Sequence, residues 1–305
     1  NDSGAAIQLS SILLFIVAFL FFVEKYFNQN KRFSFSKNTQ LASLIRPNNS
    51  MKFLIYVICL IPIILAFLIP VLFNLINIFS SYDVINFERL LNLTFNSFTV
   101  SLIASVLILI VSTFFLYNEK ISKSKVYYYI NQFISLGYSI PGAVVALAVV
   151  ISVTSLDNID DNIKLLGSFS VYFLILIYAY IIRFMAVGKS PIKSSMEKYP
   201  DSYNSSAKNL GLSNFKIFQK IYFPINKYAF FTALTLVFVD IMKELPITLI
   251  LRPFNFDTLA TQTYEFAIEE MIPLSSVYSS VIIIICCILL IFLKMFLDKS
   301  NVFRN

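Results

Sequence analysis

The chain has 305 residues, of which 58% are apolar and 13% are charged, its mean hydropathy is +0.77 and its net charge is +7. Soluble domains carry about 45–50% apolar and about 25% charged residues, so these values exclude a water-soluble globule and a disordered chain. The sequence contains no His and no GxxxxGK[ST] motif. These absences exclude His-based catalysis, the usual zinc sites and an ATP-binding P-loop in this chain.

Stretches of about 20 mostly apolar residues predict helices that cross a membrane. Seven such stretches occur in the chain, at 5–23, 53–79, 95–117, 127–154, 166–188, 228–250 and 275–297. The sequence therefore predicts an all-α polytopic membrane protein with about seven transmembrane helices, and the lipid bilayer is its first expected partner.

The basic residues orient these helices. Nineteen of the 24 Lys and Arg residues lie in one alternate set of segments, namely 24–52, 118–126, 189–227 and the tail from Lys294. Because Lys and Arg accumulate in cytoplasmic loops, this set is predicted to be cytoplasmic, with the N-terminus outside and the C-terminus inside. The same bias accounts for the net charge, so a nucleic-acid partner is not expected.

The two middle spans, 127–154 and 166–188, each contain one unusual feature. Residues 139–142 read Ser-Ile-Pro-Gly, which predicts a break or kink within 127–154. Pro141 and Gly142 are therefore candidate hinge residues, although a packing notch would have the same sequence. Arg183 lies near the predicted cytoplasmic end of 166–188, where we expect its side chain to snorkel to the surface.

The cytoplasmic segment 189–227 is too long for a simple connection, and its centre predicts two short helices. Pro200 suits a first helical position and Gly211 suits the residue just past a helix end. Ser213 suits the N-cap of the second helix, which Pro224 is expected to end. Such a hairpin could lie on lipid headgroups or dock a soluble partner, and spacing alone favours neither alternative.

Three charged residues, Asp240, Lys243 and Glu244, are expected midway along the sixth span, 228–250. Charges at this depth need partners or water, and the helical spacing pairs Lys243 with Asp240 and directs Glu244 elsewhere. Pro246 breaks the helix soon afterwards and is a third candidate hinge. The three charges could line a translocation pathway or gate, or they could form a structural ion pair between helices.

The 199–224 loop resembles the EAA loop of the permease subunits of ABC importers. In that family a Glu-Ala-Ala triplet is followed after three residues by Gly, and nine further residues lead to Ile-x-Leu-Pro. The matching positions here are Ser205, Ser206, Ala207, Gly211, Ile221 and Pro224, so the Glu is absent. The resemblance implies that these residues couple the permease to a dimer of ATPase subunits. ATP would then bind the partner, and this chain would carry no cofactor, no metal site and no catalytic residue.

Segments further along resemble the ferric-iron-type group of these permeases. The residues are Val239-Asp240-Ile241-Met242-Lys243-Glu244-Leu245-Pro246 and 252–261, together with 137–142 and 180–184. The resemblance implies import of iron(III) from a periplasmic iron-binding protein across the bacterial inner membrane by alternating access. It also implies a second permease domain, in the same polypeptide or in a homodimer.

The family pattern also predicts the domain organisation. Six spans from residue 53 onward form one permease repeat, so 1–28 is expected to be the last transmembrane helix of a preceding repeat in a longer, fused protein. The other predicted parts are a cytoplasmic linker at 29–51, the type I permease domain at 52–298 and a cytoplasmic tail at 299–305.

Several alternatives stay open at this stage. Sulfate, thiamine and polyamine permeases share the EAA loop, and a proton-coupled secondary transporter could use Asp240, Lys243 and Glu244 as a relay. The predicted outer loop carries Asp257, Glu265, Glu269 and Glu270, which are interpreted as a solvated acidic face that docks the binding protein. Coordination of iron(III) by the outer or the intramembrane carboxylates is the weaker interpretation, because a conduit that binds tightly would not release its cargo.

Overall fold

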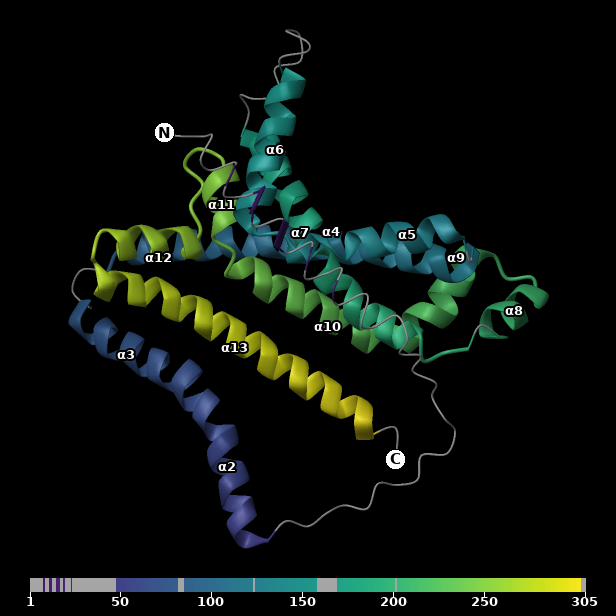
Figure 1. Ribbon diagram of the computed structural model, residues 1–305, viewed down its shortest axis with the longest axis horizontal. Coiled ribbons are helices and arrows are strands. Elements are labelled where there is room, and N and C mark those ends of the chain that lie inside the picture. Colours follow the sequence, from purple (N-terminus) through teal and green to yellow (C-terminus); the bar gives the residue numbers. More distant parts are fainter. Residues whose placement is uncertain are drawn as a thin grey trace. The chain divides into compact units, whose positions relative to one another are not determined.

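The structure is a computed structural model that describes residues 48–81, 85–122, 124–157, 169–200 and 202–302, with isolated positions between 8 and 23. Every regular element in these ranges is a helix, so the all-α fold predicted from the sequence is confirmed (Figure 1). The chain forms two compact units, Asn1–Tyr82 and Asp83–Asn305. The predicted span 5–23 lies outside the described residues, apart from those isolated positions.

The first unit contains one long apolar rod. It consists of α2 (Asn49–Ile63), a π-helical turn η1 (Ile64–Leu68) and α3 (Ile69–Ser81). The side chain of Asn48 caps the start of α2 by accepting a hydrogen bond from the backbone N–H of Asn49 at 2.7 Å. This rod contains the predicted span 53–79 and is long enough to cross a bilayer.

The second unit contains the remaining helices. They are α4 (Phe87–Ser122), α5 (Lys125–Ile134), the 3-10 turn η3 (Gly137–Ser139), α6 (Gly142–Asp157), α7 (Phe169–Met196), α8 (Ser202–Asn209), α9 (Asn214–Ile217), the π-helical turn η4 (Phe218–Tyr222), α10 (Phe223–Met242), α11 (Pro246–Leu251), α12 (Leu259–Ile268) and α13 (Ile272–Val302). The short helices α8 and α9 lie at one end of this unit and α12 lies at the other (Figure 1).

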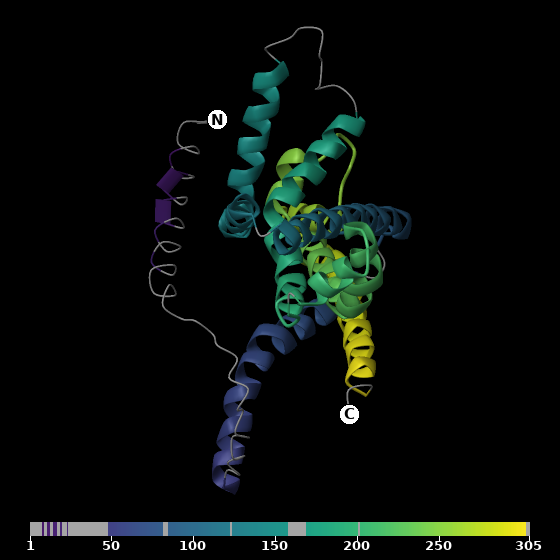
Figure 2. The ribbon, with the colours of Figure 1, turned by 90° about the vertical axis from the view of Figure 1, so that its right-hand side faces the viewer.

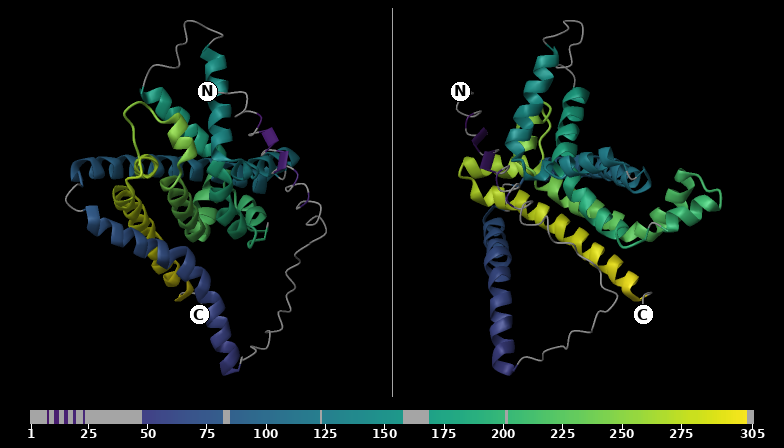
Figure 3. Two further views of the ribbon diagram at one scale, coloured as in Figure 1. Left: turned by 60° about the vertical axis from the view of Figure 1, so that its left-hand side comes forward. Right: turned by 45° about the vertical axis from the view of Figure 1, so that its right-hand side comes forward.

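The core of this unit lies where α4, α7 and α10 pack against one another. Small side chains line these contacts, among them the fully buried Ala104, Ser105 and Ala233. Small residues let membrane helices approach closely, which is needed where apolar surface alone gives no preference for protein over lipid. Helix α13 runs beside α10 and leaves most of its apolar surface exposed (Figure 3).

The described residues contain five helices that could cross a membrane, or six if one bent pair counts as a span. Two predicted boundaries were wrong because helices continue into the segment that was predicted to be a loop. Helix α7 extends to Met196, and α9, η4 and α10 form one continuous rod over Asn214–Met242. The span expected at 228–250 therefore begins earlier and ends at Met242.

The bent pair contains the predicted break at residues 139–142. Segments Lys125–Ser139 and Gly142–Ser155 meet at 114°, and α6 turns sharply away from α5 (Figure 2). Ile140 is extended, with φ −80° and ψ 130°, as expected for a residue that precedes proline. The break is thus confirmed, but it separates two helices and is far larger than a kink.

A π-helical turn joins the loop to the core. Turn η4 continues α9 directly into α10, and Pro224 occupies the first turn of α10. Proline has no N–H to donate, and it is tolerated here because the π-helical turn just before it already interrupts the regular α-helical hydrogen-bonding pattern. The prediction that Pro224 ends the second short helix was therefore wrong.

Candidate functional site

The 199–224 loop is built around one glycine turn. Gly211 has a φ of +77°. Its N–H donates a hydrogen bond to the carbonyl of Lys208 at 2.9 Å, and the N–H of Leu212 donates one to the carbonyl of Ala207 at 3.1 Å. This pair of bonds is the Schellman motif, which satisfies the last carbonyls of a helix. The predicted turn is confirmed, whereas α8 begins at Ser202 and not at Pro200.

The second short helix begins as its sequence predicts. The hydroxyl of Ser213 accepts a hydrogen bond from the N–H of Lys216 at 3.5 Å, so Ser213 is the N-cap of α9. The hydroxyl of Tyr117, on α4, donates to the carbonyl of Asn214 at 2.5 Å. This bond fixes the start of α9 against the end of α4.

Both short helices are packed onto the transmembrane core. Ala207 of α8 and Ile217 of α9 are buried in one apolar cluster with Leu116 of α4 and Ile192 of α7. Lys120 of α4 donates hydrogen bonds to the carbonyls of Met196, the last residue of α7, and of Tyr199 just beyond it. The loop therefore contacts α4, α7 and α10 directly.

The loop also presents a protruding apolar surface. Leu210 is 81% exposed and Phe215 is 73% exposed. Of the positions that match the EAA pattern, Ala207 is buried, Ile221 is half-buried, and Ser205, Ser206, Gly211 and Pro224 are exposed. This exposed apolar surface suits the two alternatives that the sequence left open, lipid headgroups and a soluble protein partner.

The three charged residues of the sixth span lie at a helix end. Asp240 is in the last turn of α10, Lys243 follows the helix, and α11 starts at Pro246. The expected ion pair is present, with 2.9 Å between Lys243 Nζ and Asp240 Oδ1. The prediction that the three charges lie midway along a span was wrong, because the helix ends at Met242.

Glu244 pairs with a residue that the sequence analysis placed elsewhere. Its Oε1 lies 3.7 Å from Nη1 of Arg183, and their side chains are 8% and 19% exposed. Arg183 lies mid-helix, because α7 continues to Met196, so the expectation that it snorkels to the surface was wrong. The available signal was a lone Arg within an apolar stretch, which requires a buried partner.

Gly142, one of the predicted hinge residues, lies against this pair. A Cβ atom on Gly142 would overlap Arg183 Nη1 and would come within 2.6 Å of Glu244 Oε1. The break before α6, the centre of α7 and the break after α10 therefore meet at one point. Residues 142, 183 and 244 are distant in sequence, so no spacing rule could have placed them together.

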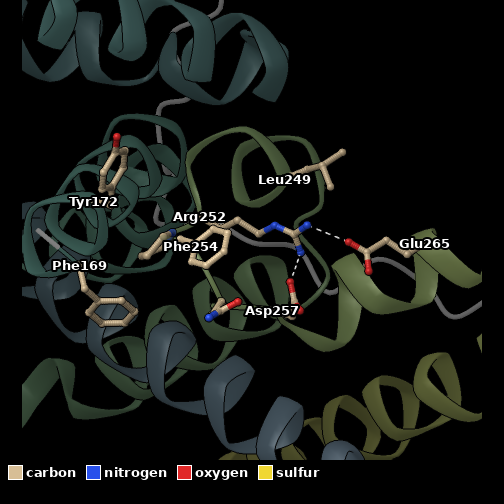
Figure 4. Close-up of a pocket in the computed structure, with 9 residues that line it drawn as sticks. Phe169, Tyr172, Leu249, Arg252, Phe254, Asp257 and Glu265 are labelled. Atoms are coloured by element: carbon tan, nitrogen blue, oxygen red, sulfur yellow. Dashed lines mark hydrogen bonds and ion pairs between the residues drawn. The ribbon is translucent and has the colours of Figure 1, made fainter. Parts of the chain in front are cut away.

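At the end of the unit opposite the 199–224 loop, a groove of about 730 Å³ is lined by Phe169, Tyr172, Leu249, Pro253 and neighbouring residues. Arg252 binds both Asp257 and Glu265, the latter at 2.7 Å (Figure 4). Phe254 is 90% exposed beside them. Of the four residues of the predicted solvated acidic face, Asp257 and Glu265 are paired with Arg252, whereas Glu269 and Glu270 are exposed.

The described residues contain no group of three or more His, Cys, Asp or Glu side chains that could hold a metal ion. The carboxylates Asp240 and Glu244, at the α10–α11 break, each pair with a cation instead. The observed geometry therefore gives no support to the interpretation that these carboxylates coordinate iron.

Residues 120–301, more than half of the chain, match the family of binding-protein-dependent transport system inner membrane components. The chain belongs to this family. It is a permease of the ABC importer class, as the sequence predicts, and a multi-pass membrane protein.

A curated relative of the permease is the Fe(3+)-transport system permease protein FbpB 2 of Haemophilus influenzae. The two sequences are 23% identical over 214 residues, which cover 70% of this chain and 40% of the relative. The chain thus spans well under half the length of that protein.

Two solved structures share the fold. One is a bacterial ABC transporter involved in the import of alginate, an acidic polysaccharide, with a TM-score of 0.62 and 14% identity. The other is a bacterial alginate transporter in complex with an alginate-bound periplasmic protein, with a TM-score of 0.61 and 15% identity. Each alignment covers 82% of this chain and 96% of the chain in the solved structure. At these identities the likeness establishes the fold alone.

Proposed function

We propose that the permease imports iron(III) across the bacterial inner membrane, receiving it from a periplasmic binding protein and using ATP hydrolysed by separate ATPase subunits. The chain itself hydrolyses nothing. A second permease domain, in the same polypeptide or in a homodimer, completes the pathway, and the N-terminus lies outside and the C-terminus in the cytoplasm.

The 199–224 loop is the observation that carries the coupling role. Its two short helices are fixed to the core by Ala207 and Ile217, while Leu210 and Phe215 protrude. A proton-coupled carrier has no use for such a projection, which argues against the alternative that Asp240, Lys243 and Glu244 form a proton relay.

The mechanism follows from what the loop contacts. Closure of the ATPase dimer on ATP displaces the loop, and the packed ends of α4, α7 and α10 move with it. A change of state needs a free-energy difference between the two arrangements, and here the ATPase supplies it. The cargo site then faces alternately outward, to the binding protein, and inward.

The choice of iron rests on similarity of sequence. Support comes from the ferric-iron relative and from the segment 239–261, whose residues resemble those of ferric-iron-type permeases. Sulfate, thiamine and polyamines are the competing substrates.

Uptake of radioactive iron(III) tests the proposal in cells that lack the full-length protein. Restored uptake on complementation with the wild-type gene, and not with a Gly211→Val variant, would support both the substrate and the coupling loop. Unchanged iron uptake in the deletion strain would reject iron, and the same assay with labelled sulfate, thiamine and polyamines would follow.

A further inference from the structure

The buried ion pair between Arg183 and Glu244 is used by no part of the mechanism above. Arg183 Nε and Nη1 are both inaccessible to solvent and have no hydrogen-bond partner within the described ranges. A charged group buried with unmet donors is costly, and such residues inside a membrane protein are commonly functional.

The distance within the pair leaves a direct hydrogen bond unformed. A charge-assisted hydrogen bond between guanidinium and carboxylate has an N···O distance of about 2.7–2.9 Å. The observed 3.7 Å between Arg183 Nη1 and Glu244 Oε1 is too long for such a bond. A shift of about 1 Å would form such a bond and satisfy a buried donor, so relative movement of α7 and the α10–α11 break would change the strength of the pair.

The pair joins the two elements that such a shift would move. Glu244 lies in the break between α10 and α11, and its carboxylate accepts the N–H of Ile247 in the first turn of α11 at 3.4 Å. A second link joins the same helices, because the hydroxyls of Tyr180 and Thr248 are 2.6 Å apart. Helix α7 therefore contacts α11 through two polar links, of which only the ion pair is under-satisfied.

Helix α7 also fixes the bent pair α5–α6. The ammonium of Lys189 is buried and donates to the carbonyl of Asn131 and, at 2.6 Å, to the hydroxyl of Ser135, at the end of α5. A Cβ on Gly137 would overlap the backbone carbonyl of Ile182. The bend is thus held against α7, and the Arg183–Glu244 pair links the same helix to the α10–α11 break.

We propose that Arg183 is a positioning residue of the transport cycle, which moves the α10–α11 break with α7 through its ion pair with Glu244. This inference rests on the proposed function, because the 199–224 loop supplies the displacement of α7. The contribution of Gly142 to the ion pair is the space left by its missing side chain, which Arg183 and Glu244 occupy.

The test uses the complete transporter with its ATPase subunits in proteoliposomes, and compares Arg183→Gln with Gly142→Ala. Both changes weaken the pair, one by removing the charge and the other by placing a methyl group in its space. We expect each to keep ATP hydrolysis without cargo, to lose stimulation by the iron-loaded binding protein, and to lower uptake per inserted molecule about tenfold or more.

Two variants serve as controls. Gly188→Ala also adds a methyl group to a buried glycine of α7, where it would lie 2.9 Å from Ile108 Cγ2 and touch no charged group. Lys193→Gln removes a charge from α7 at an exposed ion pair with Glu197, in which the Lys side chain is 41% exposed. Both are expected to keep uptake per inserted molecule within about twofold of wild type.

The double variant Gly142→Ala/Arg183→Gln decides whether the two residues act together. Because both act on one interaction, we expect the double variant to be no worse than Arg183→Gln alone. Additive losses, wild-type stimulation in Arg183→Gln, or equal losses in Gly188→Ala would each overturn the inference. Failure of the wild-type transporter to take up iron would instead reject the proposed substrate.

Discussion

Gly142 and Gly211 are both candidate functional glycines, yet the structure requires glycine at the two positions for opposite reasons. Gly211 has φ +77° with no atom within 4 Å of where its Cβ would be. Gly142 is surrounded, and its Cβ would meet Arg183 and Glu244. The first glycine is needed for its backbone conformation and the second for its lack of volume, so the same substitutions should have different consequences at the two positions.

The largest effect is expected for Gly142→Val. The added atoms displace a buried ion pair and overpack the point where α6, α7 and the α10–α11 break meet, at a cost of about 3 kcal/mol or more. The thermal unfolding midpoint of the purified permease in detergent should fall well below that of wild type. An unchanged midpoint would show that the space around Gly142 is not restrictive.

Gly211→Val is expected to act on function more than on stability. A β-branched residue is strained at this φ, with a cost of about 1–2 kcal/mol confined to an exposed turn. The permease should still insert and its ATPase subunits should still hydrolyse ATP, while uptake of the transported substrate is lost. Thermal unfolding beside Gly142→Val gives the direct contrast, and equal destabilisation by the two variants would refute the comparison.

The protruding side chains of the loop provide a test without backbone strain. Leu210→Ala and Phe215→Ala remove exposed apolar surface and should leave the unfolding midpoint unchanged. If this surface docks the ATPase, affinity for that subunit should fall about tenfold, or about 1.4 kcal/mol, in each variant. Phe133→Ala, on α5, is the control. The Phe133 side chain is 77% exposed but lies outside the 199–224 loop, so this variant should bind the ATPase subunit with normal affinity.

The smallest effect is expected for Gly211→Asn. Asn tolerates the left-handed conformation better than other non-glycine residues, so the cost should be only a few tenths of a kcal/mol. Uptake by this variant should be close to that of wild type. Loss of uptake as severe as with valine would show that glycine is required here for close approach of a partner and not for its backbone conformation.

The same contrast explains what the sequence could predict. The apolar stretches from residue 53 onward, the glycine turn, the Ser213 cap and the break at Pro141 are local patterns, and the described residues show each of them as helix, turn, cap or break. The contacts of Arg183 with Glu244 and Gly142 join three elements that are remote in sequence. Their pairing depends on how α7 packs against two helix breaks, which no local pattern records.

Boundary errors had a related cause. Apolar content marks where a helix lies in lipid but not where it ends, so α7 and the rod Asn214–Met242 extend into a stretch that reads as a polar loop. The last predicted span, 275–297, has more accurate boundaries. The membrane-crossing part of α13 is Ile272–Asp298, and its apolar surface is largely exposed.

The π-helical turn η4 sets the rotational phase of the helix that follows. Each residue advances an α-helix by about 100°, so the wider turn at Phe218–Tyr222 rotates everything beyond it relative to α9. The face of α10 that meets α4 and α7, including Ala233 and Val237, is therefore in register with the loop only because of that turn. A π-helical turn holds about one residue more than an α-helical turn, so loss of one residue there would join α9 and α10 as a regular α-helix and keep the core face of α10 near its present orientation.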